Sequence, residues 1–199
     1  MINYINLKQQ YISERKKLLS IIDKTLSTGQ YILEKEVDLF EKSIKKFNKS
    51  KYCVALNSGT DALTLALHMV GVKRNDEVIT SSNSFVASTS VIAHLGARPI
   101  FSDVLPNQNI DPEDIKKKIT KKTKAIMPVH LTGRPCEMDE IMYLSKKYGI
   151  PVIEDAAQAI GTKYKKKNVG NFGEIGCYSA HPLKNLNALG DSGYLVCNN

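Results

Sequence analysis

The chain has 199 residues, of which 42% are hydrophobic and 24% are charged, the composition of an ordinary globular protein. A chain of this length can bury roughly 70% of its unfolded surface, enough for one full hydrophobic core. No stretch approaches the ~18 consecutive apolar residues of a membrane-spanning helix, and the first residues lack the apolar core of a secretory signal, so we expect a cytoplasmic protein that binds no membrane.

The net charge of +8 raises the question of an anionic partner. The lysines lie mostly in helix and turn segments such as residues 113–124 and 144–149, without a basic stripe interleaved with aromatic residues. This pattern favours solvated faces over a nucleic-acid surface. The cysteines lie far apart and form no CxxC pair, which favours free, mostly buried thiols over a disulfide framework or a metal site. They are Cys53, Cys136, Cys177 and Cys197.

Residues 1–50 have helical patterns with a loop near residues 27–31, and we treat them as an N-terminal helical segment before a second domain, residues 51–199. In the second domain, short apolar β-branched runs alternate with amphipathic patterns. The strands are expected at residues 51–58, 76–81, 98–104, 124–131 and 150–156. The helices are expected at residues 61–71, 86–96 and 137–149, with one more that Asp111 caps and Pro112 begins.

Two more apolar runs, residues 175–180 and 193–198, predict the last strands. A parallel pair needs a crossover of about a dozen residues, usually a helix, and there is little room for one here. We therefore expect one antiparallel strand at the end of an otherwise parallel sheet. The predicted fold class is α/β, with a mostly parallel seven-stranded sheet covered by helices.

Ligands of open α/β sheets bind beyond the carboxyl ends of the strands, so the polar residues at those ends are the candidates for function. In NSGTDAL, residues 57–63, a strand turns through Ser58, Gly59 and Thr60 into a helix. Free backbone N–H groups and hydroxyls at the positive end of a helix dipole suit a phosphate group. A plain helix cap by Ser58 or Thr60 fits the same residues, and both interpretations stay open.

VIEDAAQ, residues 152–158, carries Glu154 and Asp155 where a buried strand should emerge. Successive strand residues point to opposite faces, so only one of these carboxylates can face a given ligand. A buried carboxylate is costly unless it meets a cation. Asp155 is therefore either the N-cap of a helix or the partner of a protonated ring nitrogen.

Lys184 stands alone in SAHPLKNLNALGDSG, residues 179–193, whereas lysines elsewhere in the chain occur in runs. It is either a surface lysine in a loop or a functional amine. A phosphate anchor, a strand-end aspartate and an isolated lysine, on three different strand ends, are the groups that bind the phosphate, the ring nitrogen and the aldehyde of pyridoxal phosphate.

With these residues in place, the chain resembles the DegT/DnrJ/EryC1/StrS family of sugar-nucleotide aminotransferases, which are fold-type I pyridoxal phosphate enzymes. The resemblance covers nearly all of the chain. It rests on the ordered segments GQYI, NSGTDALTLAL, DEVITSSNSFVAST, GARPIFSDV, MPVHLTGRP, VIEDAAQAIG and SAHPLKNLNALGDSG. Family members continue into a smaller C-terminal domain that is absent here, so we expect the large-domain portion of the fold.

The resemblance implies a role for several single residues. Lys184 would be the catalytic lysine, which binds the cofactor covalently and then moves a proton. Asp155 would pair with the pyridine nitrogen, Gln158 would reach the phenolic oxygen, and Phe85 would stack on the ring rather than serve as a core phenylalanine.

The resemblance also implies that the cofactor phosphate is bound by Gly59, Thr60, Asp61 and Ser179. His130 and His181 lie in the same family segments, and we expect them to pack or to lie at the substrate edge, without a catalytic role. No metal is implied.

The activity implied by the resemblance is transfer of an amino group from an amino acid, usually glutamate, to a keto sugar on a nucleoside diphosphate. Such a reaction makes amino sugars for surface polysaccharides, lipopolysaccharide among them. A homodimer with shared active sites is implied as well. Two alternatives stay open: another fold-type I pyridoxal phosphate enzyme, or a truncated, non-catalytic domain that binds the cofactor or dimerises.

Overall fold

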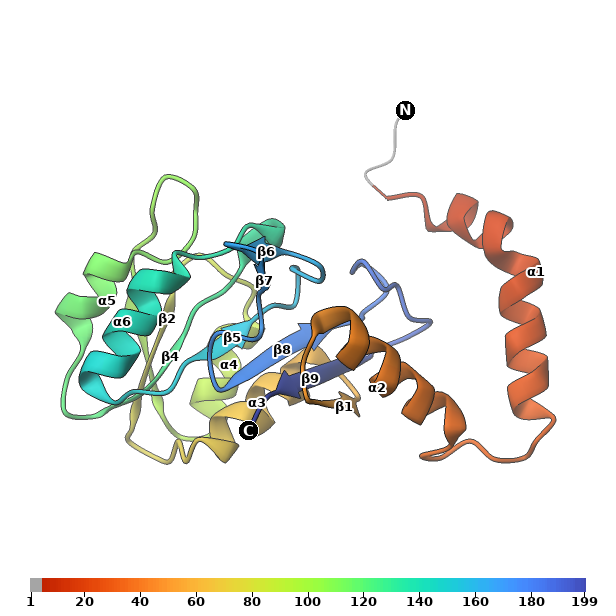
Figure 1. The fold of residues 1–199 in the computed structure, drawn as a ribbon, viewed down its shortest axis with the longest axis horizontal. Coiled ribbons are helices and arrows are strands. Elements are labelled where there is room, and N and C mark those ends of the chain that lie inside the picture. Colours follow the sequence, from red (N-terminus) through yellow and green to blue (C-terminus); the bar gives the residue numbers. More distant parts are fainter. Residues whose placement is uncertain (1–4) are drawn as a thin grey trace. The chain divides into compact units, whose positions relative to one another are not determined.

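The structure is a computed structural model that describes residues 5–199 (Figure 1). The chain divides into two compact units, Met1–Leu39 and Phe40–Asn199. In the first unit, helix α1 (Leu7–Leu26) begins after Asn6, whose side chain caps it. A turn near the predicted loop leads to α2 (Lys35–Asn48), which begins in the first unit and ends in the second. Residues 1–4 of the predicted N-terminal segment lie outside the described residues.

The second unit contains every strand and helix that the alternation predicted beyond residue 50. The main strands are β1 (Tyr52–Leu56), β2 (Glu77–Ser81), β3 (Arg98–Ser102), β4 (Thr123–Met127), β5 (Ile153–Asp155), β8 (Ile175–Ser179) and β9 (Gly193–Cys197). The helices are α3 (Gly59–Met69), α4 (Ala87–His94), α5 (Pro112–Lys118) and α6 (Met138–Tyr148), with a 3-10 turn η1 (Leu131–Gly133). A short hairpin that the sequence did not predict adds β6 (Lys163–Tyr164) and β7 (Lys167–Asn168).

The main strands form two sheets, not the single seven-stranded sheet predicted from the sequence. One sheet has the order β3-β2-β4 and the other β1-β9-β8-β5. Isolated parallel bridges from Ile126 to Val152 and from Val129 to Asp155 link β4 to β5. Pro128 and Pro151 explain the interruption, because each offers a carbonyl but no N–H to a ladder between these strands.

The final strand β9 is antiparallel to β8, as predicted, but it does not lie at the end of the sheet. It lies between β8 and β1 and is antiparallel to both, so this sheet is mixed. The pairing of β1 with β9 joins residues 52–56 to residues 193–197. A contact at that separation leaves no trace in local sequence patterns.

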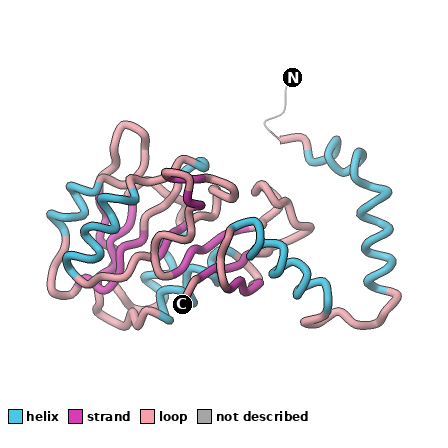
Figure 2. Tube along the Cα trace, viewed as in Figure 1, coloured by secondary structure: helices cyan, strands magenta, loops and turns pink. Residues whose placement is uncertain are grey.

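Helices cover both faces of the sheets (Figures 1 and 2). On one face, α3 and α4 pack on residues such as Ile153, Cys177 and Leu195. On the other face, α5 and α6 cover the three-stranded sheet. Tyr178 and Tyr194 of the four-stranded sheet stack against each other there, with ring centroids 4.8 Å apart. Successive residues of a strand thus pack against opposite helix layers, as expected for a strand that is buried on both sides.

The four cysteines are free thiols, as the sequence predicted, with Cys53, Cys136 and Cys177 buried. Burial raises the pKa of Cys53 to about 12 and also raises that of Cys177, so both thiols stay protonated at neutral pH. No helix in residues 5–199 has the length and apolar character needed to cross a membrane.

Candidate active site

The carboxyl ends of the parallel strands open into one cavity of about 570 Å³. Because β9 is antiparallel, its first residues reach the same edge, and Ser192 lines the cavity too. Of the eight site residues predicted from the sequence, the structure brings seven to this cavity: Gly59, Thr60, Phe85, Asp155, Gln158, Ser179 and Lys184. Asp61 does not line it.

The N-terminus of α3 forms one wall. Ser58 is the N-cap in extended conformation, and its hydroxyl accepts a hydrogen bond from the N–H of Asp61 at 3.0 Å. The first N–H groups of a helix have no partner within it, so those of Gly59 and Thr60 are available at the positive end of the dipole. The Ser58 cap is therefore present, with the N–H of Asp61 as its partner, and it leaves the anion-binding interpretation open as a prediction.

Gly59 allows Ser179 of β8 to approach this helix end closely. A Cβ added at Gly59 would lie 2.9 Å from Cβ of Ser179, which is closer than side chains tolerate. The hydroxyl of Ser179 and the first turn of α3 can act on one small group only because this position has no side chain. Ser179 also accepts a hydrogen bond from the N–H of His181 at 3.3 Å.

Asp155 ends β5 at the base of the cavity and is only 5% exposed. Its Oδ2 accepts a hydrogen bond from the hydroxyl of Ser88 at 2.7 Å, and its Oδ1 accepts one from the N–H of Ala157 at 3.1 Å. Burial raises the pKa of Asp155, while these two hydrogen bonds and the nearby charge of Lys184 act to lower it. Irregular turns, not a helix, follow Asp155, so it is not a helix N-cap.

Glu154 points away from the cavity and holds the backbone around it. Its carboxylate accepts hydrogen bonds from the N–H groups of Gly170, Phe172 and Gly173, each within 2.7 Å, and lies 3.0 Å from Nε2 of His130. Nδ1 of His130 accepts the N–H of Cys136, so the proton of the neutral ring is on Nε2 and is donated to Glu154. His130 is fully buried and belongs to this structural network.

Gln158 is held by the loop after β4. Its Oε1 accepts a hydrogen bond from the N–H of Thr132 at 2.8 Å, which leaves its NH₂ group as the part able to donate to a ligand. Thr132 adopts a left-handed conformation, with φ of 54°, that a threonine rarely takes. Buried Asn109 fixes this loop, because its side chain bonds to the backbone of Leu131 and of Arg134.

Lys184 lies in a loop between β8 and β9 that is braced by its own hydrogen bonds. The N–H of Lys184 donates to the carbonyl of His181 at 2.7 Å, and Lys184 accepts from the N–H of Asn187 at 2.9 Å. Nδ1 of His181 accepts from the N–H of Leu183, and its Nε2 lies 3.8 Å from Asp191. His181 therefore lines the cavity and also shapes the loop that presents the lysine.

Phe85 lies between β2 and α4 and leaves 66% of its surface exposed. An apolar ring this exposed at a cavity wall does not serve the core, and its face is available to a flat ligand.

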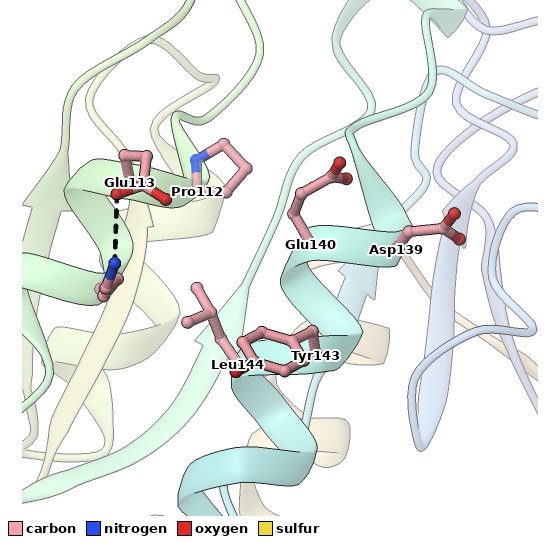
Figure 3. Close-up of a pocket in the computed structure, with 7 residues that line it drawn as sticks. Pro112, Glu113, Asp139, Glu140, Tyr143 and Leu144 are labelled. Atoms are coloured by element: carbon pink, nitrogen blue, oxygen red, sulfur yellow. Dashed lines mark hydrogen bonds and ion pairs between the residues drawn. The ribbon is translucent and has the colours of Figure 1, made fainter.

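Two other cavities of the described residues contain none of the predicted site residues. Figure 3 shows one of about 260 Å³ between α5 and α6, where Glu113, Asp139 and Glu140 give it an acidic lining. Another, of about 380 Å³, is lined by asparagines and by Lys49 and Lys165–Lys167.

Comparison with known proteins matches residues 13–199 to the DegT/DnrJ/EryC1/StrS aminotransferase family. The chain belongs to this family. Among its relatives, the UDP-2-acetamido-2-deoxy-3-oxo-D-glucuronate aminotransferase of Pseudomonas aeruginosa is 42% identical over 199 residues, which are 100% of this chain and 55% of that protein. The dTDP-3-amino-3,6-dideoxy-alpha-D-galactopyranose transaminase of Aneurinibacillus thermoaerophilus is 42% identical over 180 residues, 90% of this chain and 50% of that protein.

Solved structures of similar proteins share the fold. The structure of S. venezuelae DesV in complex with a ketimine intermediate superposes with a TM-score of 0.96 at 34% sequence identity. The match covers 100% of this chain and 54% of the DesV chain. NtdA from Bacillus subtilis, with bound cofactor PMP, gives a TM-score of 0.89 at 34% identity over 94% of this chain and 42% of its own. The chain thus spans about half the length of the relatives that it matches.

The sequence did not predict the residues whose hydrogen bonds fix the predicted site residues and the loop beside them. Ser88 and Asn109 bond to groups 67 and 22 positions away, respectively. Glu154 was seen as an acid beside Asp155, and strand alternation correctly predicted that only one of the two faces the cavity. Ser88 is one of three consecutive hydroxyl residues near the start of α4, residues 88–90, and only the fold brings it to Asp155.

Proposed function

We propose that the chain is the cofactor-binding part of a pyridoxal phosphate-dependent aminotransferase that acts on nucleotide-linked keto sugars. The observation that carries this proposal is that one cavity combines a helix N-terminus, a buried aspartate and a lysine from three strand ends. The names of the relatives, which are transaminases of UDP- and dTDP-linked sugars, support the substrate class.

The residues of the cavity fit pyridoxal phosphate group by group. The N–H groups of Gly59 and Thr60 with the hydroxyl of Ser179 would hold the phosphate, where the missing side chain of Gly59 leaves space. Asp155 is an acceptor at the base of the cavity, suited to a protonated ring nitrogen.

Two further residues would orient the ring. The NH₂ group of Gln158, whose carbonyl is already occupied by Thr132, would donate to the phenolic oxygen. Phe85 would cover one face of the ring.

Lys184 would bind the aldehyde carbon of the cofactor covalently. Bound pyridoxal phosphate would accept the amino group of a donor and hold the electron pair left when the substrate C–H bond breaks. The free amine of Lys184 would take a proton from the substrate carbon and deliver it to the aldehyde carbon of the cofactor, on the other side of the shared nitrogen. The His181 bonds that brace its loop would keep the amine within reach of both carbons.

The donor is proposed to be L-glutamate, which would leave as 2-oxoglutarate, and the acceptor a keto sugar on a nucleoside diphosphate. The product would serve polysaccharide synthesis in the cytoplasm. A homodimer is proposed as well, because α1 contains no buried residue and exposes apolar side chains: Tyr11, Ile12, Leu19, Ile22 and Leu26.

The half-reaction tests the proposal. The chain loaded with pyridoxal phosphate should release about one equivalent of 2-oxoglutarate from L-glutamate, and a nucleoside-diphosphate keto sugar added afterwards should gain the amino group, measured by mass spectrometry. Lys184→Ala should abolish both steps, while Lys117→Ala, a change at an exposed lysine on α5, should not. Cofactor binding without amino transfer from any amino acid would favour the non-catalytic alternative.

A further inference from the structure

Ser88 is a buried polar residue that the proposed function does not use. It lies near the start of α4 and is fully inaccessible to solvent. Its hydroxyl lies 2.7 Å from Oδ2 of Asp155 and 2.7 Å from the hydroxyl of Ser84, which lines the cavity. The three side chains form a continuous chain of hydrogen bonds beside the cavity.

The direction of this chain follows from the charge of Asp155. An ionised carboxylate only accepts hydrogen bonds, so Ser88 donates to Asp155. The oxygen of Ser88 then accepts the proton of Ser84. The chain is thus arranged to stabilise the charged form of Asp155, and a hydrogen bond to a buried charged group is stronger than one between neutral groups.

Burial works against that charge. Burial raises the pKa of Asp155, and the bond from Ser88 is the largest of the effects that oppose it. The ionisable groups around Asp155 are His130 after β4, Lys184 after β8, Cys177 on β8 and Glu154 on its own strand. The effect of Lys184 on Asp155 depends on the charge of its amine, whereas the bond from Ser88 requires no charge of its own.

We propose that Ser88 is a positioning residue, which with Ser84 holds Oδ2 of Asp155 and keeps this carboxylate ionised and fixed in orientation. The purpose of this arrangement, to present an anion to a protonated ring nitrogen, rests on the proposed function. The effect on Asp155 itself belongs to the chain without cofactor and can be measured there.

The first test is the titration of Asp155 in the cofactor-free chain, followed by the NMR signal of its carboxyl carbon, with Asp155→Asn to assign the signal. Ser88→Ala should raise the midpoint by about one pH unit or more, since one hydrogen bond to a charged group is lost. Ser84→Ala should raise it less, because Ser88 keeps its own bond. An unchanged midpoint in Ser88→Ala overturns the proposal.

The matched control is Ser90→Ala on the same helix. Ser90 donates its hydroxyl to the carbonyl of Ala87 and is not a partner of Asp155, so the midpoint should stay that of the wild type. Ser88→Thr, which keeps the hydroxyl, should return the midpoint toward that value. If Ser90→Ala moves the midpoint as far as Ser88→Ala, the effect is one of helix stability and the proposal fails. If Ser88→Ala does not fold, Ser84→Ala decides, and no upward shift in it overturns the proposal.

A second readout is the pH dependence of unfolding without cofactor. The pKa of Asp155 is raised on folding, so its contribution to stability is present at low pH and is lost as the pH rises through the folded pKa. In Ser88→Ala the loss of this contribution should extend to a higher pH than in the wild type. Each contribution is measured as the difference in stability from the same chain carrying Asp155→Asn. If the chain shows these shifts but binds no pyridoxal phosphate, only the proposed function is refuted. If the chain binds pyridoxal phosphate but shows no such shifts, only this inference is refuted.

Discussion

Gly59 is the residue at which the absence of a side chain matters most for the cavity. Its missing Cβ lets Ser179 approach the first turn of α3. Gly59→Ala should therefore push the two walls apart and weaken pyridoxal phosphate binding at least about tenfold, which corresponds to about 1.4 kcal/mol. Fluorescence titration measures the affinity.

Gly190→Ala is the matched control, since an added Cβ there meets nothing within 4 Å. It should bind the cofactor as the wild type does. Equal affinities of the Gly59→Ala and wild-type chains would show that the phosphate is not held at this helix end.

Several single-residue predictions from the sequence depended on local chemistry, and these were readable. Asp111 caps α5 and Pro112 occupies its first turn, as predicted, because the cap bond spans only two positions. The roles of Ser88, Asn109 and the backbone of Thr132 were not readable, because each depends on a partner that the fold brings from another element.

Among the elements, the segment from residue 168 to 173 depends on one buried charge. Glu154 of β5 accepts three backbone N–H groups from this segment and the proton of His130. Glu154→Ala would leave these donors without an acceptor, and those of Gly170 and His130 are buried, so the free energy of unfolding should fall by about 3–5 kcal/mol. Urea denaturation measures the change.

Glu113→Ala gives the comparison for a surface carboxylate. Its ion pair with Lys116 is exposed, and the change in unfolding free energy should stay within about 0.5 kcal/mol. Similar small losses in both variants would contradict the role assigned to Glu154.

The elements themselves were largely predictable, whereas their arrangement was only partly so. Short apolar, β-branched runs marked the main strands, and the short segment between β8 and β9 correctly indicated an antiparallel pair. Two features depend on long-range pairing: the place of β9 between β8 and β1, and the break beside Pro128 and Pro151. The lysine-rich hairpin β6–β7 was missed because its strands are too short to form a pattern.

At the scale of the whole molecule, the apolar surface of α1 bears on the proposed homodimer. Ile22→Glu places a charge in the middle of that surface and should lower the dimer fraction measured by light scattering after size-exclusion chromatography. Lys17→Glu, on the opposite side of the same helix, should not. A chain that is monomeric without either change would refute the dimer proposal.

The central claim is that this cavity binds pyridoxal phosphate through Lys184. The most direct measurement is borohydride reduction of the chain with pyridoxal phosphate, followed by peptide mass spectrometry. We expect one cofactor fixed per chain, on the peptide that carries Lys184, and none in Lys184→Ala. Labelling spread over the exposed lysines, or labelling that persists in Lys184→Ala, would contradict the claim.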